Sequence, residues 1–527
     1  MGSNSLVAIV LVPLLPWLIY KIIAHIWRTS TPLPYPPGPK PKPLIGNMFE
    51  MLQPDVPRAF AKLGKQYGSI VHLRVMGQHF VVLNSFEDAE ELLEKRAGIY
   101  SDRPVLPIVK LMGWEYNFAL LPHNDEWRQH RKMAHQHFRA AEAVKYLPTQ
   151  RRKVCEFLQD LMVTPEQFHE HSKKLSIAIP LSTMYGYDIT SLDDPCIAAA
   201  DESALLGGKL LAPGQNFIDI FPILGRVPEW FPGAVSVRMA AKTKRLTEEV
   251  KRIPMEHAKK MMEKGQAKPS LVTEFLEKKW RVGASKEEEG IVQNIANTVY
   301  GVDCRFSGLR HGNPIEILTI SVTGAFMFFM VTNPDLQRKA QAEIDRVVGS
   351  NRLPDITDRP NMPYIEALYR EVMRMGLPLP LALPHVLSED DCYKGYFLPK
   401  GALVLPNIWA MNHDEQKYAE PFNFRPERFI DDSGQLNDDS RILAYGFGRR
   451  VCVGKYIASS TMWLIIASVL ACFDIVKAKD EHGQEIEVDD SIEDHGPGRH
   501  RARFQCTFVA RSPEALNLIN EAVNADT

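Results

Sequence analysis

Hydrophobic positions along the chain follow two periods, and the helical period dominates. Residues 69–84 alternate between apolar and polar side chains around a central Met-Gly-Gln, which predicts a β-hairpin. From about residue 86 onward, apolar side chains recur every three or four positions, which indicates amphipathic helices. Short strands are expected around residues 381–406, where Gly, Pro and Lys interrupt the apolar runs. The clearest helical segments are residues 88–96, 125–138, 150–161, 237–264 and 334–348. The pattern therefore predicts a mainly α-helical fold with small β-sheets.

The first long apolar run covers Leu6–Trp27. Its 22 residues, at about 1.5 Å each, are enough to cross a bilayer core of about 30 Å. No basic residue precedes the run, whereas Lys21, Arg28 and Lys40 lie at its end or beyond it. This asymmetry favours a cytosolic body, and it disfavours a cleaved signal peptide, which has a basic segment before its apolar core. Residues 1–30 are therefore expected to form a single transmembrane anchor helix.

A proline-rich segment, residues 31–47, follows the expected anchor. Its prolines fix φ and lack N–H donors, so it cannot continue the helix and is expected to be a stiff linker. A second apolar run, Tyr456–Phe473, contains three serines and a threonine. It is therefore expected to be a buried core helix rather than another membrane span. Residues 48–527 are expected to form one large domain.

The charge balance is nearly neutral, with 62 Lys and Arg against 64 Asp and Glu and a net charge of −2. It gives no electrostatic argument for nucleic-acid binding. The cysteines number seven, an odd count, and no Cys-x-x-Cys pair occurs. A disulfide framework is therefore disfavoured, and a reducing compartment is expected.

One cysteine stands in an unusual context, the segment Leu443–Gly454 with the sequence LAYGFGRRVCVG. An apolar helical run follows, so Cys452 comes just before a helix N-terminus, where the dipole and free N–H groups favour a thiolate. Arg449 and Arg450 add positive charge nearby. The glycines allow the backbone to pass close to a flat ligand. Most cysteines are inert core residues, but a thiolate in this setting can ligate haem iron, so Cys452 is the candidate metal ligand.

This segment resembles the haem-binding loop of the cytochrome P450 family, F-x-x-G-x-R-x-C-x-G. Gly448, Arg450, Cys452 and Gly454 match the pattern, and Tyr445 replaces its Phe. The resemblance implies a cytochrome P450-like fold and a haem b cofactor, iron protoporphyrin IX. It also implies that Cys452 is the axial ligand of the haem iron.

Two further motifs occur in the order that the family has. Glu371-Val-Met-Arg374 resembles the family's E-x-x-R on a helix, where side chains three positions apart share a face. The sequence Pro-Glu-Arg-Phe at residues 426–429 resembles the family's P-E-R-F. By this resemblance Arg428 joins Glu371 and Arg374 in a structural cluster behind the haem.

Five residues are implied as contacts of the haem propionates. Trp127 and Arg131 match the family's W-x-x-x-R helix, and arginine is suited to carboxylates. By the same resemblance His385, Arg450 and Arg103 also hold propionates. The match runs from the linker to about Cys506 and is closest to fungal microsomal members.

The family carries an oxygen-activating motif, [AG]-G-x-[DE]-T, in a long central helix that is expected here at 287–332. Residues 305–318 contain two glycines, a proline, two arginines, a histidine and a glutamate, which would break a buried helix at a cost of roughly 3 kcal/mol or more. Asp303 and Cys304 fill the last two positions of the motif, so cysteine replaces the usual threonine. Without residues 305–318, Thr319 would follow Cys304 directly. Asp303, Cys304 and Thr319 are the candidates for the oxygen-side proton relay.

Two explanations of residues 305–318 stay open. The segment is either an artefact of the gene product, from a retained short intron or a misplaced splice site, or a real insertion. A real insertion would bend the helix over the haem and alter how the protein handles oxygen.

The resemblance implies a monooxygenase of the endoplasmic reticulum membrane, anchored among its lipids. It would take electrons from NADPH through a separate cytochrome P450 reductase and insert one atom of O2 into an apolar small molecule, as in secondary metabolism or xenobiotic oxidation. Substrate contacts are expected from the loop after Arg103, residues 204–230 and residues 376–384. Two alternatives stay open: a haem–thiolate isomerase or dehydratase that needs no reductase, and a catalytically impaired form that binds haem or a lipophile.

Overall fold

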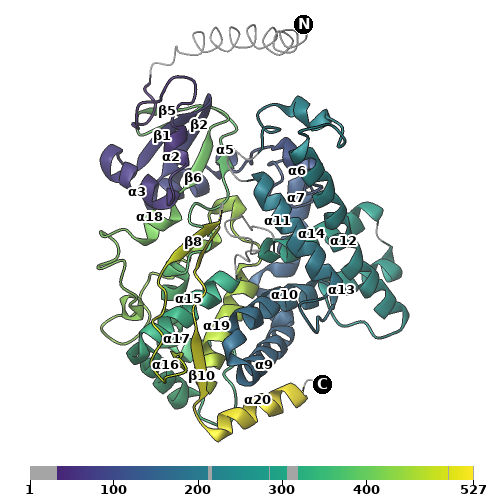
Figure 1. The fold of residues 1–527 in the computed structure, drawn as a ribbon, viewed down its shortest axis with the longest axis vertical. Coiled ribbons are helices and arrows are strands. Elements are labelled where there is room, and N and C mark those ends of the chain that lie inside the picture. Colours follow the sequence, from purple (N-terminus) through teal and green to yellow (C-terminus); the bar gives the residue numbers. More distant parts are fainter. Residues whose placement is uncertain (1–32, 212–215, 284, 305–318, 496–497, 526–527) are drawn as a thin grey trace.

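The computed structural model describes residues 33–211, 216–283, 285–304, 319–495 and 498–525, and helices dominate this part of the chain (Figure 1). The expected anchor lies outside the described residues, as do the first residues of the linker. The predicted mainly helical fold with small sheets is confirmed.

The long helices carry most of the described chain. They are α3 (Val56–Tyr67), α7 (Asp125–Phe138), α9 (Leu147–Val163), α10 (Phe168–Tyr185), α11 (Pro195–Leu211), α12 (Val235–Glu263), α13 (Leu271–Val282), α14 (Lys286–Cys304), α15 (Thr319–Thr332), α16 (Pro334–Val347), α17 (Pro363–Met375), α19 (Lys455–Cys472) and α20 (Pro513–Ala525). The shorter α-helices are α2 (Met48–Met51), α4 (Phe86–Glu90), α5 (Ala97–Tyr100), α6 (Pro107–Leu111), α8 (Ala140–Ala143) and α18 (Ile408–Asn412). Single turns of 3₁₀-helix are η2 (Val144–Tyr146), η3 (Pro165–Gln167), η4 (Pro222–Arg226), η5 (Arg359–Asn361), η6 (Pro426–Phe429), η7 (Leu443–Tyr445) and η8 (Gly448–Arg450), and η1 (Glu91–Lys95) is a π-turn.

The predicted hairpin forms one side of a four-stranded sheet. Strand β1 (Ile70–Val75) pairs antiparallel with β2 (Gln78–Leu83), and Met76 and Gly77 turn between them with φ of 47° and 88°. Strand β2 pairs in parallel with β6 (Leu403–Pro406), which pairs antiparallel with β3 (His385–Val386). The two-stranded sheets join β4 (Asp391–Tyr393) to β5 (Tyr396–Leu398), β7 (Phe473–Lys477) to β10 (Cys506–Ala510), and β8 (Ile492–His495) to β9 (Gly498–Arg501).

The second apolar run forms α19, in the middle of the helical body (Figure 1). Helices α9, α15, α16 and α17 pack around it, and Trp463 and Ile465 are fully buried there. Among the described residues α19 is the one helix with the length and hydropathy to cross a membrane, but 67% of its apolar window is buried inside the protein. The prediction of a core helix is therefore confirmed for this run.

One predicted helix is divided. The segment expected to be helical over residues 88–96 begins as α4 and continues as the π-turn η1, where the Arg96 N–H donates to the Glu91 carbonyl at 3.0 Å. The wider turn brings the Leu93 carbonyl against Gly448, where an added Cβ would lie 2.0 Å from that oxygen. Packing of the cysteine loop against this turn thus accounts for the departure from a regular helix.

Two helices cover the expected central helix on either side of residues 305–318. Helix α14 ends at Cys304, and α15 begins at Thr319. The segment 305–318 lies outside the described residues. The two parts flank the site that contains Cys452.

Candidate active site

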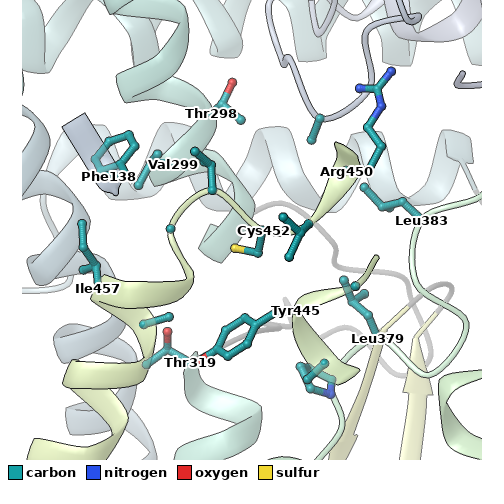
Figure 2. A pocket seen from close by; sticks show the side chains of 18 of the residues that line it. Phe138, Thr298, Val299, Thr319, Leu379, Leu383, Tyr445, Arg450, Cys452 and Ile457 are labelled. Carbon is teal, nitrogen blue, oxygen red and sulfur yellow. The ribbon is translucent and has the colours of Figure 1, made fainter. Parts of the chain in front are cut away.

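A cavity of about 300 Å³ lies between α7, α10, α14, α15 and α19, and Cys452 forms part of its wall (Figure 2). In this view the Cys452 side chain lies between Val299 of α14 and the ring of Tyr445. Most of the lining is apolar, and its polar side chains are few. They are Arg103, Arg131, Arg450, His385, Ser176, Thr183, Thr298, Thr319, Tyr445 and Thr461.

The loop that carries Cys452 is held by its backbone. Gly446 and Gly448 have φ of 76° and 52°, which side-chain-bearing residues rarely adopt. The Cys452 N–H donates to the Tyr445 carbonyl at 2.8 Å, which closes the loop. Helix α19 begins at Lys455, with Gly454 as its N-cap residue. Cys452 therefore lies within one turn of a helix N-terminus, where the dipole stabilises a thiolate.

Three arginines line the cavity, and each donates to backbone carbonyl oxygens. Arg103 donates to Leu383 and Pro384 at 2.8 and 2.7 Å, and Arg131 donates to Val451 at 2.7 Å. Arg450 donates to Ser101 and Leu121, both at 2.8 Å. No aspartate or glutamate lines this cavity within the described part of the chain.

Burial makes the charged form of these arginines less favourable. Together with the neighbouring charge of Arg450, it lowers the pKa of Arg103 to about 9. Burial also lowers the pKa of Arg450 to about 10 and shifts that of Arg131 in the same direction. The nearby charge of Asp102 opposes the shifts of Arg103 and Arg450. A bound anion would relieve this desolvation, so the site is suited to a ligand with carboxylates.

Trp127 and Arg131 share one face of α7, as their spacing predicts. The Asn124 side chain caps this helix by accepting from the Trp127 N–H at 2.9 Å. The Trp127 ring is buried, and the Arg450 guanidinium lies 4.3 Å from its centre. Both residues thus reach the same cavity wall as Arg450.

His385 also reaches the cavity, with one ring nitrogen already bonded to the backbone. Its Nδ1 lies 2.8 Å from the Tyr100 carbonyl, which can only accept, so Nδ1 carries the proton. Burial and the charge of Arg103 hold the pKa of His385 well below its usual value. At neutral pH its Nε2 is therefore an acceptor, and it would have to gain a proton before it could donate to a carboxylate.

Glu371, Arg374 and Arg428 lie together in a buried cluster. Arg374 donates to both carboxylate oxygens of Glu371, at 2.7 and 2.8 Å, and Arg428 Nε donates to Oε1 at 3.1 Å. Arg374 also holds the carbonyls of Asn412 and Pro421. The cluster does not line the cavity; it ties α17 to the segment that leads to the cysteine loop.

The structure describes the side chain of one of the three residues that are candidates for the oxygen-side proton relay. Thr319, the first residue of α15, lines the cavity. Asp303 and Cys304 end α14, but their side chains lie outside the described residues. Sequence reasoning missed Thr298, which also lines the cavity and whose hydroxyl donates back to the Asn294 carbonyl at 2.8 Å. Thr298 lies five residues before Asp303, a spacing that does not place two side chains on one helix face, so no spacing rule points to it.

The cavity wall includes residues from two of the three segments that are expected to contact the substrate. Phe118 and Ala119 line the cavity in the loop after Arg103, as do Pro378, Leu379, Ala382 and Leu383. None of the described residues within 204–230 lines this cavity, so their contact with substrate stays a prediction. Several apolar side chains of this range face outward instead, including Phe217, Ile223 and Trp230.

These residues fit a porphyrin with two carboxylates. Apolar walls suit its ring, buried arginines suit its carboxylates, and a cysteine at a helix N-terminus suits its iron. The arrangement defines a haem–thiolate class of protein.

Comparison with known proteins identifies the family. The sequence model of the cytochrome P450 family matches residues 36–492. The chain is 36% identical to cytochrome P450 monooxygenase COX2 of Coprinopsis cinerea, over 96% of this chain and 94% of that protein. It is 36% identical to cytochrome P450 monooxygenase claR of Ampulloclitocybe clavipes, over 95% and 90%. The chain belongs to the cytochrome P450 family, and its activity is that of a monooxygenase, an oxidoreductase that uses O2 and a redox partner.

Proposed function

We propose that the chain holds haem b through Cys452 and inserts one oxygen atom into an apolar small molecule, with electrons from NADPH through a separate cytochrome P450 reductase. The single observation that carries this proposal is the position of Cys452. It lies at the N-terminus of α19 and lines the same cavity as three arginines, and no acidic side chain among the described residues lines that cavity. Aromatic, terpenoid or steroid-like substrates suit the apolar lining.

The chain's own residues bind and orient the reactants. Arg103, Arg131 and Arg450 hold the propionates, with Trp127 packed against Arg450. When bound, the haem iron supplies the site at which O2 is activated, and the thiolate donates electron density to it. The apolar side chains exclude water and hold the substrate close. On the oxygen side, the Thr319 hydroxyl holds or passes a proton, with Asp303 and Cys304 as further candidates.

The ligand assignment is tested with the full chain and two cysteine variants. The reduced protein under carbon monoxide is expected to show the absorption band of a thiolate-ligated haem. Cys452→Ser is expected to lose that band. Cys392→Ser is the matched control, because Cys392 is an exposed cysteine on β4, outside the cavity. An unchanged band in Cys452→Ser would refute the assignment.

The reaction is tested with NADPH, a microsomal cytochrome P450 reductase and a panel of aromatic, terpenoid and steroid-like compounds. Under ¹⁸O2 the product is expected to contain one labelled atom. A product that forms without NADPH and carries no label would contradict the proposal and support the isomerase or dehydratase alternative. That alternative is favoured by one feature, the cysteine in place of threonine at position 304. A thiolate band with no product from any compound would support a form that only binds haem or a lipophile.

We propose further that residues 1–30 anchor the protein in the endoplasmic reticulum membrane with its body in the cytosol. The apolar run Leu6–Trp27 and the basic residues after it support this arrangement. Removal of residues 1–30 is expected to shift the protein from the membrane pellet toward the soluble fraction. Release of the full chain into the supernatant by alkaline carbonate would contradict a transmembrane anchor.

A further inference from the structure

Residues of α7, α12, α14 and the loop after α6 line a second cavity, of about 280 Å³. No described residue lines both this cavity and the one that contains Cys452. Its size is close to the lower end of the range for small-molecule sites, which is about 300–1,000 Å³. Six of its lining side chains carry a charge or an amide, and they are Glu115, Glu126, Lys244, Glu248, Lys251 and Asn294.

The walls of the second cavity are held by contacts behind them. The Trp114 Nε1–H donates to the Thr247 hydroxyl at 3.1 Å, and the Thr247 and Ser203 hydroxyls are 3.2 Å apart. Gly113 has φ of 70°, and a Cβ added there would lie 3.1 Å from Cγ of Lys244. The loop after α6 therefore runs close against α12, and the shape of the cavity does not depend on exposed side chains alone.

The charged side chains around the second cavity stay apart from one another. None of the five forms an ion pair with any residue that the structure describes. Elsewhere on the same helix, four basic side chains do pair with glutamates: Lys242, Arg245, Arg252 and Lys259. Opposite charges that face a common cavity without meeting favour an occupant that carries both signs.

Lys251 is the cation best placed to bind an anionic group. It is half-buried, whereas the other four charged side chains are exposed. Its ammonium group lies 4.9 Å from the centre of the Tyr116 ring. Burial lowers the pKa of Lys251, and the nearby charges of Glu115 and Glu248 oppose this shift. A carboxylate bound at Lys251 would compensate for its loss of water, and the two glutamates are close enough to hold a cation beside it.

Asn294 and Glu126 are joined through a shared neighbour, His130. His130 Nδ1 lies 2.8 Å from the Glu126 carbonyl, which can only accept, so this nitrogen donates. Nε2 then accepts from Asn294 Nδ2 at 3.2 Å. This contact fixes the amide, and within the described ranges nothing donates to its oxygen. The Asn294 oxygen and the Glu126 carboxylate are therefore two acceptors suited to a guanidinium or an ammonium group.

The charges of the second cavity disfavour simpler occupants. Three glutamates and two lysines leave it with one net negative charge, which repels an inorganic anion. The glutamates do not form a metal site, since no group of three His, Cys, Asp or Glu among the described residues could hold a metal ion. A basic amino acid carries two cationic groups and one carboxylate, so it matches both signs and balances the charge.

We propose that the second cavity binds a basic amino acid such as arginine. Lys251 holds its carboxylate, and Glu115 and Glu248 hold its α-ammonium group. Glu126 and the Asn294 amide oxygen hold its guanidinium group. The site shares no described lining residue with the Cys452 cavity, so binding can be measured without turnover.

The test is equilibrium dialysis of the purified full chain against labelled L-arginine, L-glutamate or agmatine, which is arginine without its carboxylate. The chain is expected to bind one L-arginine with a Kd on the order of 0.1–1 mM, and agmatine about tenfold more weakly, because only arginine offers a partner to Lys251. L-Glutamate, with one net negative charge, should bind more weakly than either. This comparison needs no variant, so it decides even where a substitution disturbs folding.

Two variants assign the groups of the ligand. Lys251→Met is expected to raise the Kd of arginine about tenfold without weakening agmatine, because agmatine has no carboxylate to lose a partner. Glu126→Gln should weaken both ligands, since both have the guanidinium group. Lys242→Met is the matched control on α12, because Lys242 pairs with Glu202 outside the cavity, and it should bind arginine as the wild type does.

Three results would overturn the inference. The first is no saturable binding of arginine up to about 10 mM, the range in which a site with two ion pairs should fill. The second is binding of L-glutamate as tight as that of L-arginine. The third is an equal loss of arginine and agmatine binding in Lys251→Met.

Discussion

The Arg131 guanidinium donates a hydrogen bond of 2.7 Å to the carbonyl oxygen of Val451, the residue that precedes Cys452. This bond joins α7 directly to the cysteine loop. The negative charge of Cys452 partly offsets the effect of burial on the pKa of Arg131, so the charges of the two side chains interact. One arginine thus supports the ligand loop and also lines the cavity.

Replacement of Arg131 is expected to weaken haem retention. Arg131→Ala removes a cation suited to a propionate and the bond to Val451, so the haem dissociation constant should rise about tenfold, or about 1.4 kcal/mol. Haem transfer to an excess of apomyoglobin measures the loss. Arg128→Ala on the exposed side of α7, where Arg128 pairs with Asp125, is the control and should retain haem normally. Equal retention in both variants would contradict this role.

The buried carboxylate of Glu371 is expected to dominate local stability. Its side chain is fully buried against two arginines, so Glu371→Gln leaves two buried cations without a counter-charge, and unfolding should become easier by about 3–5 kcal/mol. Chemical denaturation of the purified protein measures this change. The exposed Glu415, which pairs with Lys65, is the control, and Glu415→Gln should change stability by less than about 0.5 kcal/mol. A small effect at both positions would show that the cluster is not needed for folding.

The sequence predicts the helices of this protein better than the places where distant segments pack against one another. Helix α7 begins and ends where the apolar period places it, at Asp125 and Phe138, because its capping residue and its amphipathic face are both local signals. The π-turn η1 could not be predicted, since it depends on the approach of Gly448 from more than 350 residues away in the chain.

In the candidate site, too, the sequence predicts the residues better than the contacts between them. The family resemblance of their motifs is enough to place Cys452, Arg131 and Arg450 in one cavity, as the structure does. The tautomer of His385 depends on the carbonyl of Tyr100, which a sequence pattern does not reveal. The partner of Tyr445 is Tyr369, and it becomes visible only when α17 is packed against the cysteine loop.

Gly448 is expected to tolerate no side chain. An added Cβ would lie 2.0 Å from the Leu93 carbonyl, and φ of 52° strains any other residue. Gly448→Ala should therefore prevent assembly of the haem site, with loss of most of the thiolate-type band per mole of protein. Gly446→Ala is the matched control, because φ is also positive there but nothing lies within 4 Å of the added Cβ. It should cost only about 1 kcal/mol. Similar spectra for both variants would show that the contact with Leu93 relaxes easily.

The histidine pair on the β1–β2 hairpin is expected to make stability depend on pH. His72 Nε2 lies 2.9 Å from His79 Nδ1, and the Tyr35 ring stacks on His72 at 4.8 Å. Burial, with the charges of His79 and Arg74, lowers the pKa of His72 to about 4. Below about pH 6.5, His72 binds a proton in the unfolded chain but stays neutral in the folded protein. The free energy of unfolding therefore falls as the pH drops from about 6.5 to about 4.

His72→Gln is expected to flatten this dependence by roughly 1–3 kcal/mol over that range. Denaturation midpoints at pH 7.5 and pH 4.5 give the comparison. The exposed His482 provides a control, and His482→Gln should keep the slope of the wild type. An unchanged slope in His72→Gln would show that other groups carry the acid sensitivity.

If residues 305–318 are not part of the working enzyme, their deletion is expected to increase the share of NADPH oxidation that yields product. Helix α14 has 19 residues and α15 has 14, and the deletion joins Cys304 directly to Thr319. Since Thr319 already lines the cavity, a continuous helix would set its hydroxyl one residue from the end of the motif. The shortened protein should keep the thiolate-type band and convert a larger share of NADPH into product than the full chain. A higher share in the full chain would instead identify the segment as a functional insertion, and sequencing of the transcript across codons 300–320 would then be expected to show all 14 residues encoded.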